Sequence, residues 1–127
     1  MKNLTNDTGS QKSRTVIRTT DKQFVAYDRY GKILPGVKWL PLNLDAQSDR
    51  EIYLIEFEPG SSSHPHIHKG TEEFLVLKGC LKDNDGSVFQ PGDFVQFQPG
   101  SKHSSHSDDG CTLLVILTGG TNEASVD

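Results

Sequence analysis

The chain has 127 residues, which is enough for one domain with a sizeable core and too few for two ordinary domains. Its 13 Lys and Arg against 17 Asp and Glu give a net charge of -4, and no stretch combines basic residues with aromatics, so no nucleic-acid partner is expected. The sequence contains no secretory signal and no apolar run of about 18 residues, so we expect a cytoplasmic protein without a membrane partner.

The predicted elements are short strands. Residues 1–14 lack apolar periodicity and are rich in Asn, Thr, Ser and Lys, which predicts a flexible N-terminal tail. Between residues 15 and 120, apolar runs of strand length alternate with Pro-Gly, Asp-rich and Gly-rich turn signals, and no long segment has a helical period. We expect a second flexible tail at 121–127. The apolar runs are residues 15–18, 24–27, 37–44, 52–58, 72–82, 88–89, 94–97 and 112–118.

This pattern predicts an all-β fold, a single-domain jelly-roll barrel at residues 15–120. Closing many short antiparallel strands into a double-sheet barrel removes exposed edges and encloses an interior that can hold a small ligand. Strand alternation places Glu72, Phe74 and Val76 on one face. Five aromatic residues are expected to be core rather than lining of a substrate pocket: Trp39, Phe57, Phe74, Phe94 and Phe97.

The segment 60–72, GSSSHPHIHKGTE, carries the strongest functional signal. His66 and His68 stand at i and i+2, so on a strand both rings point to the same face, about 6.6 Å apart along the chain. After a short turn, Glu72 begins the next strand and projects toward the same side. His103 is the best fourth candidate, because a Pro-Gly turn before it returns the chain toward the interior. Imidazole and carboxylate together suit one divalent transition metal, such as Zn, Fe, Mn or Ni.

Several residues near this pattern have alternative interpretations. Glu72 could instead accept a hydrogen bond from a ligand imidazole. His64 could be a proton carrier at the rim, although a solvated loop histidine is the expectation, and His106 is expected at the surface. Cys80 and Cys111 are expected to be small buried residues rather than a redox pair or metal ligands.

Two motifs of the cupin family resemble segments of this chain. The first motif is matched at Gly60, His66, His68, Glu72 and Gly79. The second motif is matched at Gly92, Gly100 and His103, with Gln98 and Ser107 where the family has Pro and Asn. The resemblance implies a cupin barrel whose metal ligands are His66, His68, Glu72 and His103. It also implies a homodimer, as cupins often form.

Within the family, residues 33–118 most resemble the ChrR-type cupin-like domain and the neighbouring acetylacetone-cleaving dioxygenases. The run from His66 to Gly79 and the Pro99-Gly-Ser-x-His103 segment carry this likeness. The helical, cysteine-containing half that binds sigma factors in ChrR-type proteins has no counterpart here, so anti-sigma activity is not expected. The acetylacetone-cleaving enzymes hold iron with three histidines and lack the motif glutamate, whereas Glu72 is present in this chain.

Two functions remain open from the sequence, with a third role less favoured. The first is a metal-dependent, dioxygenase-like enzyme that acts on a small organic substrate such as a β-dicarbonyl, with Glu72 as the catalytic residue that leaves the metal and takes a proton. The second is a zinc-binding ligand or redox sensor without catalysis, in which the four ligands close around the ion. A purely structural, dimer-forming role is less favoured, because it leaves the ligand spacing unexplained.

Overall fold

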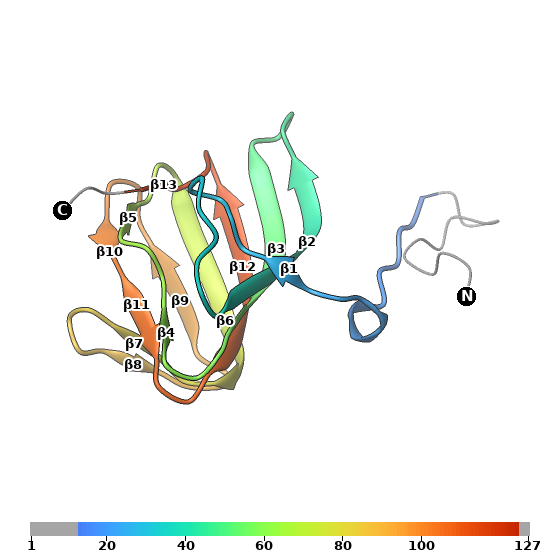
Figure 1. Cartoon of the computed structure of the whole chain (residues 1–127). Helices are drawn as coiled ribbons and strands as arrows, with labels where there is room; N and C mark the ends of the chain where they lie inside the picture. Colours follow the sequence, from blue (N-terminus) through green and yellow to red (C-terminus); the bar gives the residue numbers. More distant parts are fainter. Residues whose placement is uncertain (1–12, 125–127) are drawn as a thin grey trace.

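Short antiparallel strands make up the part of the chain that the computed structural model describes, residues 13–124 (Figure 1). Within these residues the all-β fold class predicted from the sequence is confirmed. The elements in chain order are η1 (Thr19–Asp21), a 3-10 helix, and the strands β1 (Val25–Ala26), β2 (Val37–Asp45), β3 (Arg50–Phe57), β4 (Ser61–Ser62), β5 (His66–Ile67), β6 (Thr71–Gly79), β7 (Leu81–Asp83), β8 (Val88–Phe89), β9 (Phe94–Phe97), β10 (Lys102–His103), β11 (Ser105–Ser107), β12 (Cys111–Thr118) and β13 (Glu123–Ala124).

Three sheets form the wall of the barrel. The largest has the order β1-β2-β3-β12-β6-β9, and its strands pair antiparallel throughout. A four-stranded sheet has the order β4-β11-β7-β8, and a three-stranded sheet has the order β10-β5-β13. In Figure 1 the smaller sheets stand beside the part of the large sheet that contains β6 and β9. Strands far apart in the sequence therefore meet around one interior, as the predicted jelly roll requires.

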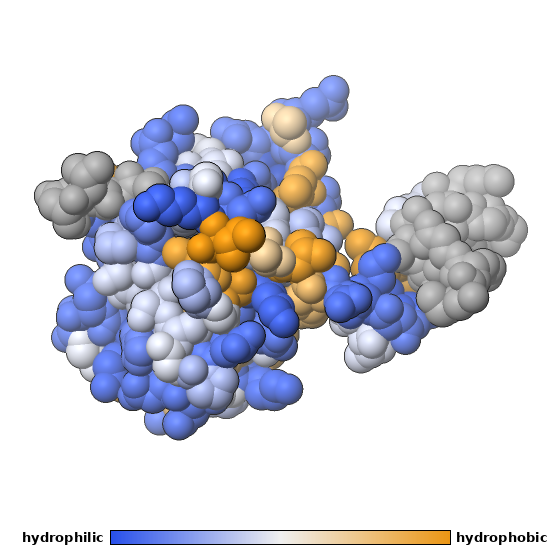
Figure 2. All heavy atoms as spheres, in the orientation of Figure 1, coloured by the Kyte–Doolittle hydropathy of each residue, from blue (hydrophilic) through white to orange (hydrophobic). Residues whose placement is uncertain are grey.

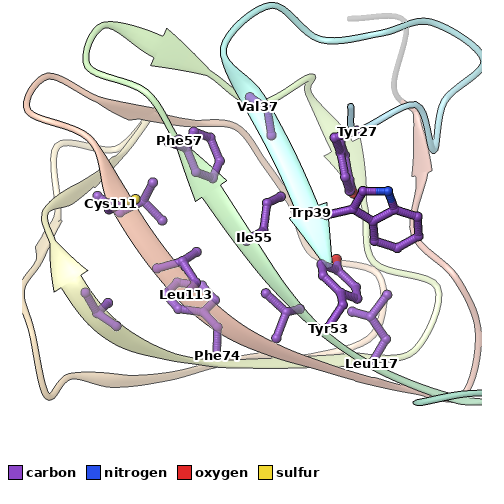
Figure 3. Packing of buried hydrophobic residues seen from close by; sticks show 13 residues of the cluster. Tyr27, Val37, Trp39, Tyr53, Ile55, Phe57, Phe74, Cys111, Leu113 and Leu117 are labelled. Atoms are coloured by element: carbon purple, nitrogen blue, oxygen red, sulfur yellow. The ribbon is translucent and has the colours of Figure 1, made fainter. Parts of the chain in front are cut away.

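Alternating side chains of the large sheet build the core. Successive residues of a strand point to opposite faces, so residues of one parity on β3, β6 and β12 all turn inward. These buried residues are Tyr53, Ile55, Phe57, Phe74, Val76, Leu113, Val115 and Leu117 (Figure 3). Burying one such side chain stabilises the fold by about 1.5–3 kcal/mol. Glu72 has the same parity on β6, so the alternation that builds the core also brings a carboxylate to the inner face.

Some elements differ from the predictions. Residues 15–18 form no strand, and η1 follows them. The strand predicted at 72–82 is divided after Gly79, whose φ is +77° and where an added Cβ would lie 2.0 Å from the carbonyl oxygen of Gly110. The chain turns at this close approach, and β7 begins at Leu81. The two-residue strands β5 and β10 are not among the predicted apolar runs, whereas the predicted run at 88–89 forms β8.

The ends of the barrel can be compared only in part with the predicted domain boundaries. The tail expected at residues 1–14 lies almost wholly outside the described residues, as do residues 125–127 of the tail expected at 121–127. Glu123 and Ala124, which the prediction places in that C-terminal tail, form β13 and pair with β5. Among residues 13–124, no helix is long and apolar enough to cross a lipid bilayer.

Candidate metal centre

Strand pairing explains how two distant segments meet. Strands β5 and β10 pair antiparallel, with His66 directly opposite His103. Two backbone hydrogen bonds join His68 to the turn before β10. The N–H of His68 donates to the carbonyl of Ser101 at 2.8 Å, and its carbonyl accepts from the N–H of Gly100 at 2.7 Å. These contacts hold the Pro-Gly turn against the segment that contains His66 and His68.

Glu72 reaches the same point from β6, after a turn in which Gly70 packs against the backbone of β12. An added Cβ on Gly70 would lie 2.0 Å from the carbonyl oxygen of Thr118. Because only glycine fits at this approach, the short connection between His68 and β6 can turn inward and present Glu72 to the histidines. All four residues that the sequence analysis proposed as metal ligands are thereby brought together, at 0–7 % exposure: His66, His68, Glu72 and His103.

The four candidate ligand atoms converge on one point. The Nε2 atoms of His66 and His103 lie 3.8 Å and 3.5 Å from Oε1 of Glu72, and the Nε2 atom of His68 also contacts this oxygen. All four atoms lie within 4.8 Å of one another. Distances of this size are those expected between ligands that share one ion at about 2.0–2.2 Å from each.

The same four atoms are buried without a hydrogen-bond partner among the described residues. Leaving one buried polar atom unsatisfied costs about 1–3 kcal/mol, so four at one point are a large and unusual cost. A cation between them would satisfy all four at once. The donor set of three nitrogens and one carboxylate oxygen therefore fits a divalent transition metal.

The other nitrogen of each ring fixes its tautomer. The Nδ1 atom of His66 lies 2.8 Å from the carbonyl oxygen of His64, and that of His103 lies 2.7 Å from Oδ1 of Asp83. Both partners can only accept, so both Nδ1 atoms carry the proton.

His68 follows the same logic through one intermediate. Its Nδ1 atom lies 2.7 Å from Oγ of Ser101, and this hydroxyl donates to the carbonyl of Gln98 at 2.6 Å. The hydroxyl proton is thus engaged, and the oxygen accepts from Nδ1–H of His68. In their neutral forms all three imidazoles point an unprotonated Nε2 at the shared point, which is the arrangement that metal-binding histidines require.

Charge at the site follows from these contacts. Burial alone would lower the pKa of His103, but the carboxylates of Asp83 and Glu72 raise it to about 9 in the metal-free protein. Burial alone would raise the pKa of the Glu72 carboxyl, yet the three nearby imidazoles hold it well below its usual range. Glu72 is therefore ionised at neutral pH, and a metal must displace a proton from His103 to bind.

A cavity opens onto this centre from one side. His66, Glu72 and His103 line it, whereas the fourth candidate ligand, His68, does not line it and has no exposed surface. The cavity volume is about 40 Å³, room for about three water molecules, and part of the cavity is open to solvent. The remaining lining is largely apolar and aromatic: Tyr27, Tyr30, Leu34, Val37, Tyr53, Ile55, Phe57, Phe74, Leu81, Leu113 and Val115, with Ser63, His64, Ser105 and Asn122. The candidate metal position therefore borders a small, partly open and largely apolar cavity.

The remaining histidines and cysteines of the sequence analysis stand apart from the four ligands. His64 borders the cavity beside Tyr30, with ring centroids 5.7 Å apart. His106 is part of the surface, where it contacts Ser62. Cys80 is half-buried and Cys111 buried, both as free thiols.

The five aromatic residues expected in the core have different environments. Trp39 is core, whereas Phe57 and Phe74 belong to the core and also line the cavity. Phe94 is 60 % exposed, contrary to the core position expected for it. Phe97 stacks on the ring of His103, with centroids 4.1 Å apart, and so supports a candidate ligand.

Sequence reasoning missed the residues that orient the histidines. Asp83 begins one of the Asp-rich turn signals of the sequence, and the corresponding hairpin forms between β7 and β8. Its carboxylate nevertheless turns inward, is 7 % exposed and also accepts a hydrogen bond from Ser105 at 2.9 Å. Alternation from the buried Leu81 could have indicated an inward Asp83. No local signal identifies Ser101 as the partner of His68.

Comparison with known proteins places these features in a family. The ChrR cupin-like domain matches residues 12–119 of the chain. A search of the curated proteins finds no match.

Several solved structures share the fold. An acetylacetone dioxygenase from Acinetobacter johnsonii is 17 % identical, with a TM-score of 0.73 over 83 % of this chain and 74 % of that one. A polyketide cyclase from Streptomyces resistomycificus is 19 % identical, with a TM-score of 0.73 over 87 % and 84 %. A cupin-like protein of unknown function from Ralstonia eutropha is 21 % identical, with a TM-score of 0.62 over 70 % of this chain and 64 % of that one, so the chain spans less than two thirds of that protein.

At such identities these structures support the fold and no particular reaction. The match over residues 12–119 is of a different kind, because it spans most of the chain and includes all four clustered residues. The chain belongs to the ChrR cupin-like domain family and has the cupin fold.

Proposed function

We propose that this protein is a metal-dependent enzyme of dioxygenase-like type that acts on a small organic substrate such as a β-dicarbonyl. The observation that carries the proposal is the cavity: three of the four candidate ligands line it, so a small molecule bound there would lie beside the metal position. The acetylacetone dioxygenase among the structural neighbours provides an example of this fold with such a substrate.

The residues have distinct roles in this proposal. His66, His68 and His103 would hold the metal through Nε2, with Glu72 as the fourth ligand. The bound ion would supply a Lewis acid and a template for an enolisable substrate. The Glu72 carboxylate is ionised at neutral pH because its pKa is lowered. After leaving the metal it would accept the proton from the carbon between two carbonyl groups, which binding to the ion would make more acidic. Largely apolar side chains would surround the substrate at this position.

A zinc-binding ligand or redox sensor without catalysis is the second candidate. Its support is the count of ligands: three histidines and one carboxylate complete a tetrahedron around zinc, which is the form of a closed structural site. In that case the ion would stiffen the barrel, and the cavity would admit a ligand without a reaction.

Metal analysis followed by oxygen uptake separates the two candidates. Protein purified without a histidine tag would be analysed for bound metals, reconstituted anaerobically with Fe(II), and supplied with 2,4-pentanedione in an oxygen-electrode cell. The enzyme proposal predicts oxygen consumption that requires both the metal and the dione. It also predicts strong loss of this activity in Glu72→Gln and no change in the surface control His106→Ala. Tightly bound stoichiometric zinc together with no dione-dependent oxygen uptake would instead support the sensor.

The expected homodimer and the small-molecule partner remain part of this proposal. Size-exclusion chromatography with light scattering tests the dimer, and a mass of about twice 14.0 kDa is the expected result. A mass near that of one chain would contradict it.

A further inference from the structure

All three tyrosines of the chain line the cavity beside the metal centre. Tyr27 follows β1, Tyr30 lies in the loop after it, and Tyr53 is on β3. Tyr27 and Tyr53 are 6 % and 3 % exposed, and Tyr30 is half-buried. We call these three residues the tyrosine wall. Its hydroxyls are the only phenols that the protein has, and they are gathered at one place.

The tyrosine wall is a connected group that faces the candidate ligands. The ring centroid of Tyr27 lies 6.3 Å from that of Tyr30 and 6.4 Å from that of Tyr53. Glu72 lines the same cavity as all three tyrosines. Tyr30 lies nearly parallel to the ring of His66, with an interplanar angle of 17° and centroids 6.1 Å apart. The three phenol rings therefore line the same cavity as the candidate ligands, and the Tyr30 ring lies beside His66.

Packing holds the wall in position. The rings of Tyr27 and Tyr53 meet Trp39 edge to face, at centroid distances of 5.4 Å and 5.2 Å (Figure 3). The guanidinium of Arg29 lies 4.9 Å from the centre of the Trp39 ring and forms an ion pair with Glu51 at 2.9 Å. Rigid donors of this kind lose little entropy when they bind a ligand.

Two backbone hydrogen bonds hold the loop that carries Tyr30. Its backbone is tied by the N–H of Leu34, which donates to the carbonyl of Tyr27 at 3.1 Å, and by the N–H of Tyr27, which donates to the carbonyl of Val37 at 3.2 Å. In Figure 2, hydrophobic residues gather on the visible face near this loop and β1, where Ile33 and Val25 are 65 % and 56 % exposed. The loop thus covers the cavity with its inner side.

Apart from its histidines, the described part of the lining contains no basic side chain. No Lys or Arg among residues 13–124 lines the cavity, and Arg29, which lies in the covering loop, is engaged with Glu51. A carboxylate or phosphate placed against the apolar walls would lose its hydration without gaining a cationic partner, which costs several kcal/mol. Neutral groups with a hydrogen-bond acceptor near the metal face no such penalty.

From this arrangement we infer that the tyrosine wall recognises the oxygens of a neutral, metal-chelating substrate. At least one phenol donates a hydrogen bond to a substrate oxygen, and Tyr30, beside the ligand His66, is the first candidate. The apolar walls reject substrates that carry an acid group away from the metal. The selected class is small uncharged β-dicarbonyls with apolar substituents. This inference rests on the proposed function, since it assumes that the substrate oxygens bind at the same metal.

Ligand binding tests the inference without catalysis. Protein loaded with Ni(II) under nitrogen would be titrated calorimetrically with 2,4-heptanedione and with 4,6-dioxoheptanoate, which has the same number of carbons and a carboxylate in place of the terminal methyl group. Wild-type protein should bind the neutral dione at least about tenfold more tightly than the acid. Equal binding of the two, or tighter binding of the acid, would overturn the selectivity.

Variants test the donor itself. Tyr30→Phe keeps the ring and removes the hydroxyl, and it should weaken dione binding about tenfold, which corresponds to about 1.4 kcal/mol, with unchanged nickel content. Tyr53→Phe tests the most buried of the three tyrosines, and Thr112→Val, which removes a hydroxyl from a half-buried residue outside the cavity lining, is the matched control. Wild-type affinity in Tyr27→Phe, Tyr30→Phe and Tyr53→Phe alike would overturn the inference, while metal-dependent dione binding would still support the proposed function. Loss of that binding in the wild type would overturn both.

Discussion

Replacing Asp83 by Asn should change how many protons the protein releases when it binds a metal. Oδ1 of Asp83 lies 2.7 Å from Nδ1 of His103, and this carboxylate is the largest of the contributions that raise the pKa of His103, which is about 9. At pH 8, His103 is then protonated in about nine tenths of the protein molecules. In Asp83→Asn the negative charge beside His103 is lost, and the pKa of His103 should fall toward its ordinary value of about 6.5. At pH 8, His103 should then be protonated in less than about a tenth of the molecules.

Calorimetry measures this difference directly. Titrating zinc into metal-free protein at pH 8, in buffers of different ionisation enthalpy, gives the number of protons released per metal bound. We expect about 0.9 proton from His103 in the wild type and less than about 0.1 in Asp83→Asn, with an affinity about 10- to 100-fold lower because the ring loses its charged partner. Asp109→Asn, an exposed change of the same charge, is the control. Equal proton release in Asp83→Asn and the wild type would refute the reasoning.

The same variant has a second expected effect, on stability. The pKa of His103 is higher in the folded metal-free protein than in the unfolded chain, so folding gains stability from its protonation. This contribution is fully present below about pH 6.5 and is lost as the pH rises through about 9. The free energy of unfolding of the metal-free wild type should therefore fall between these pH values, and Asp83→Asn should show a flatter profile. Urea unfolding across the range checks this, and a parallel pH dependence in both proteins would contradict it.

Three further predictions concern other parts of the barrel. Ser101→Ala should weaken metal binding about tenfold in a chelator competition, because Nδ1 of His68 loses its acceptor; an unchanged affinity would contradict the tautomer argument. Gly70→Ala should destabilise the fold by more than about 2 kcal/mol in urea unfolding, because its Cβ would lie 2.0 Å from the carbonyl oxygen of Thr118; wild-type stability would show that the turn can relax. Burial raises the pKa of the Cys111 thiol to about 11, so this thiol should resist a disulfide reagent at pH 8 until the protein unfolds, and rapid labelling of Cys111 in folded protein would contradict the packing.

The sequence predicted those parts of the site whose geometry is local. The i, i+2 spacing of His66 and His68 and the position of Glu72 at the start of a strand are enough to place three side chains on one face. His103 was indicated by its Pro-Gly turn and by the cupin resemblance, and its place opposite His66 depends on the pairing of β5 and β10. Longer strands such as β3 and β12 were also predicted, because their alternation extends over several residues.

The missed residues depend on contacts between segments far apart in the chain. Asp83 reaches His103 across 20 positions, and Ser101 reaches His68 across 33. Neither spacing follows from a strand period, so the register of several strands must be known before these partners can be found. The tyrosine wall has the same character, because Tyr30 and Tyr53 come from a loop and a strand that only the closed barrel brings together.

An X-ray absorption spectrum at the edge of the bound metal tests the central claim most directly. If His66, His68, Glu72 and His103 surround one cation, the spectrum should contain imidazole scattering from three rings and a first shell of nitrogen and oxygen at about 2.0–2.2 Å. His103→Ala should remove one imidazole contribution or the metal itself, and the surface control His106→Ala should leave the spectrum unchanged. A sulfur ligand near about 2.3 Å, or an unchanged three-imidazole spectrum in His103→Ala, would contradict the account.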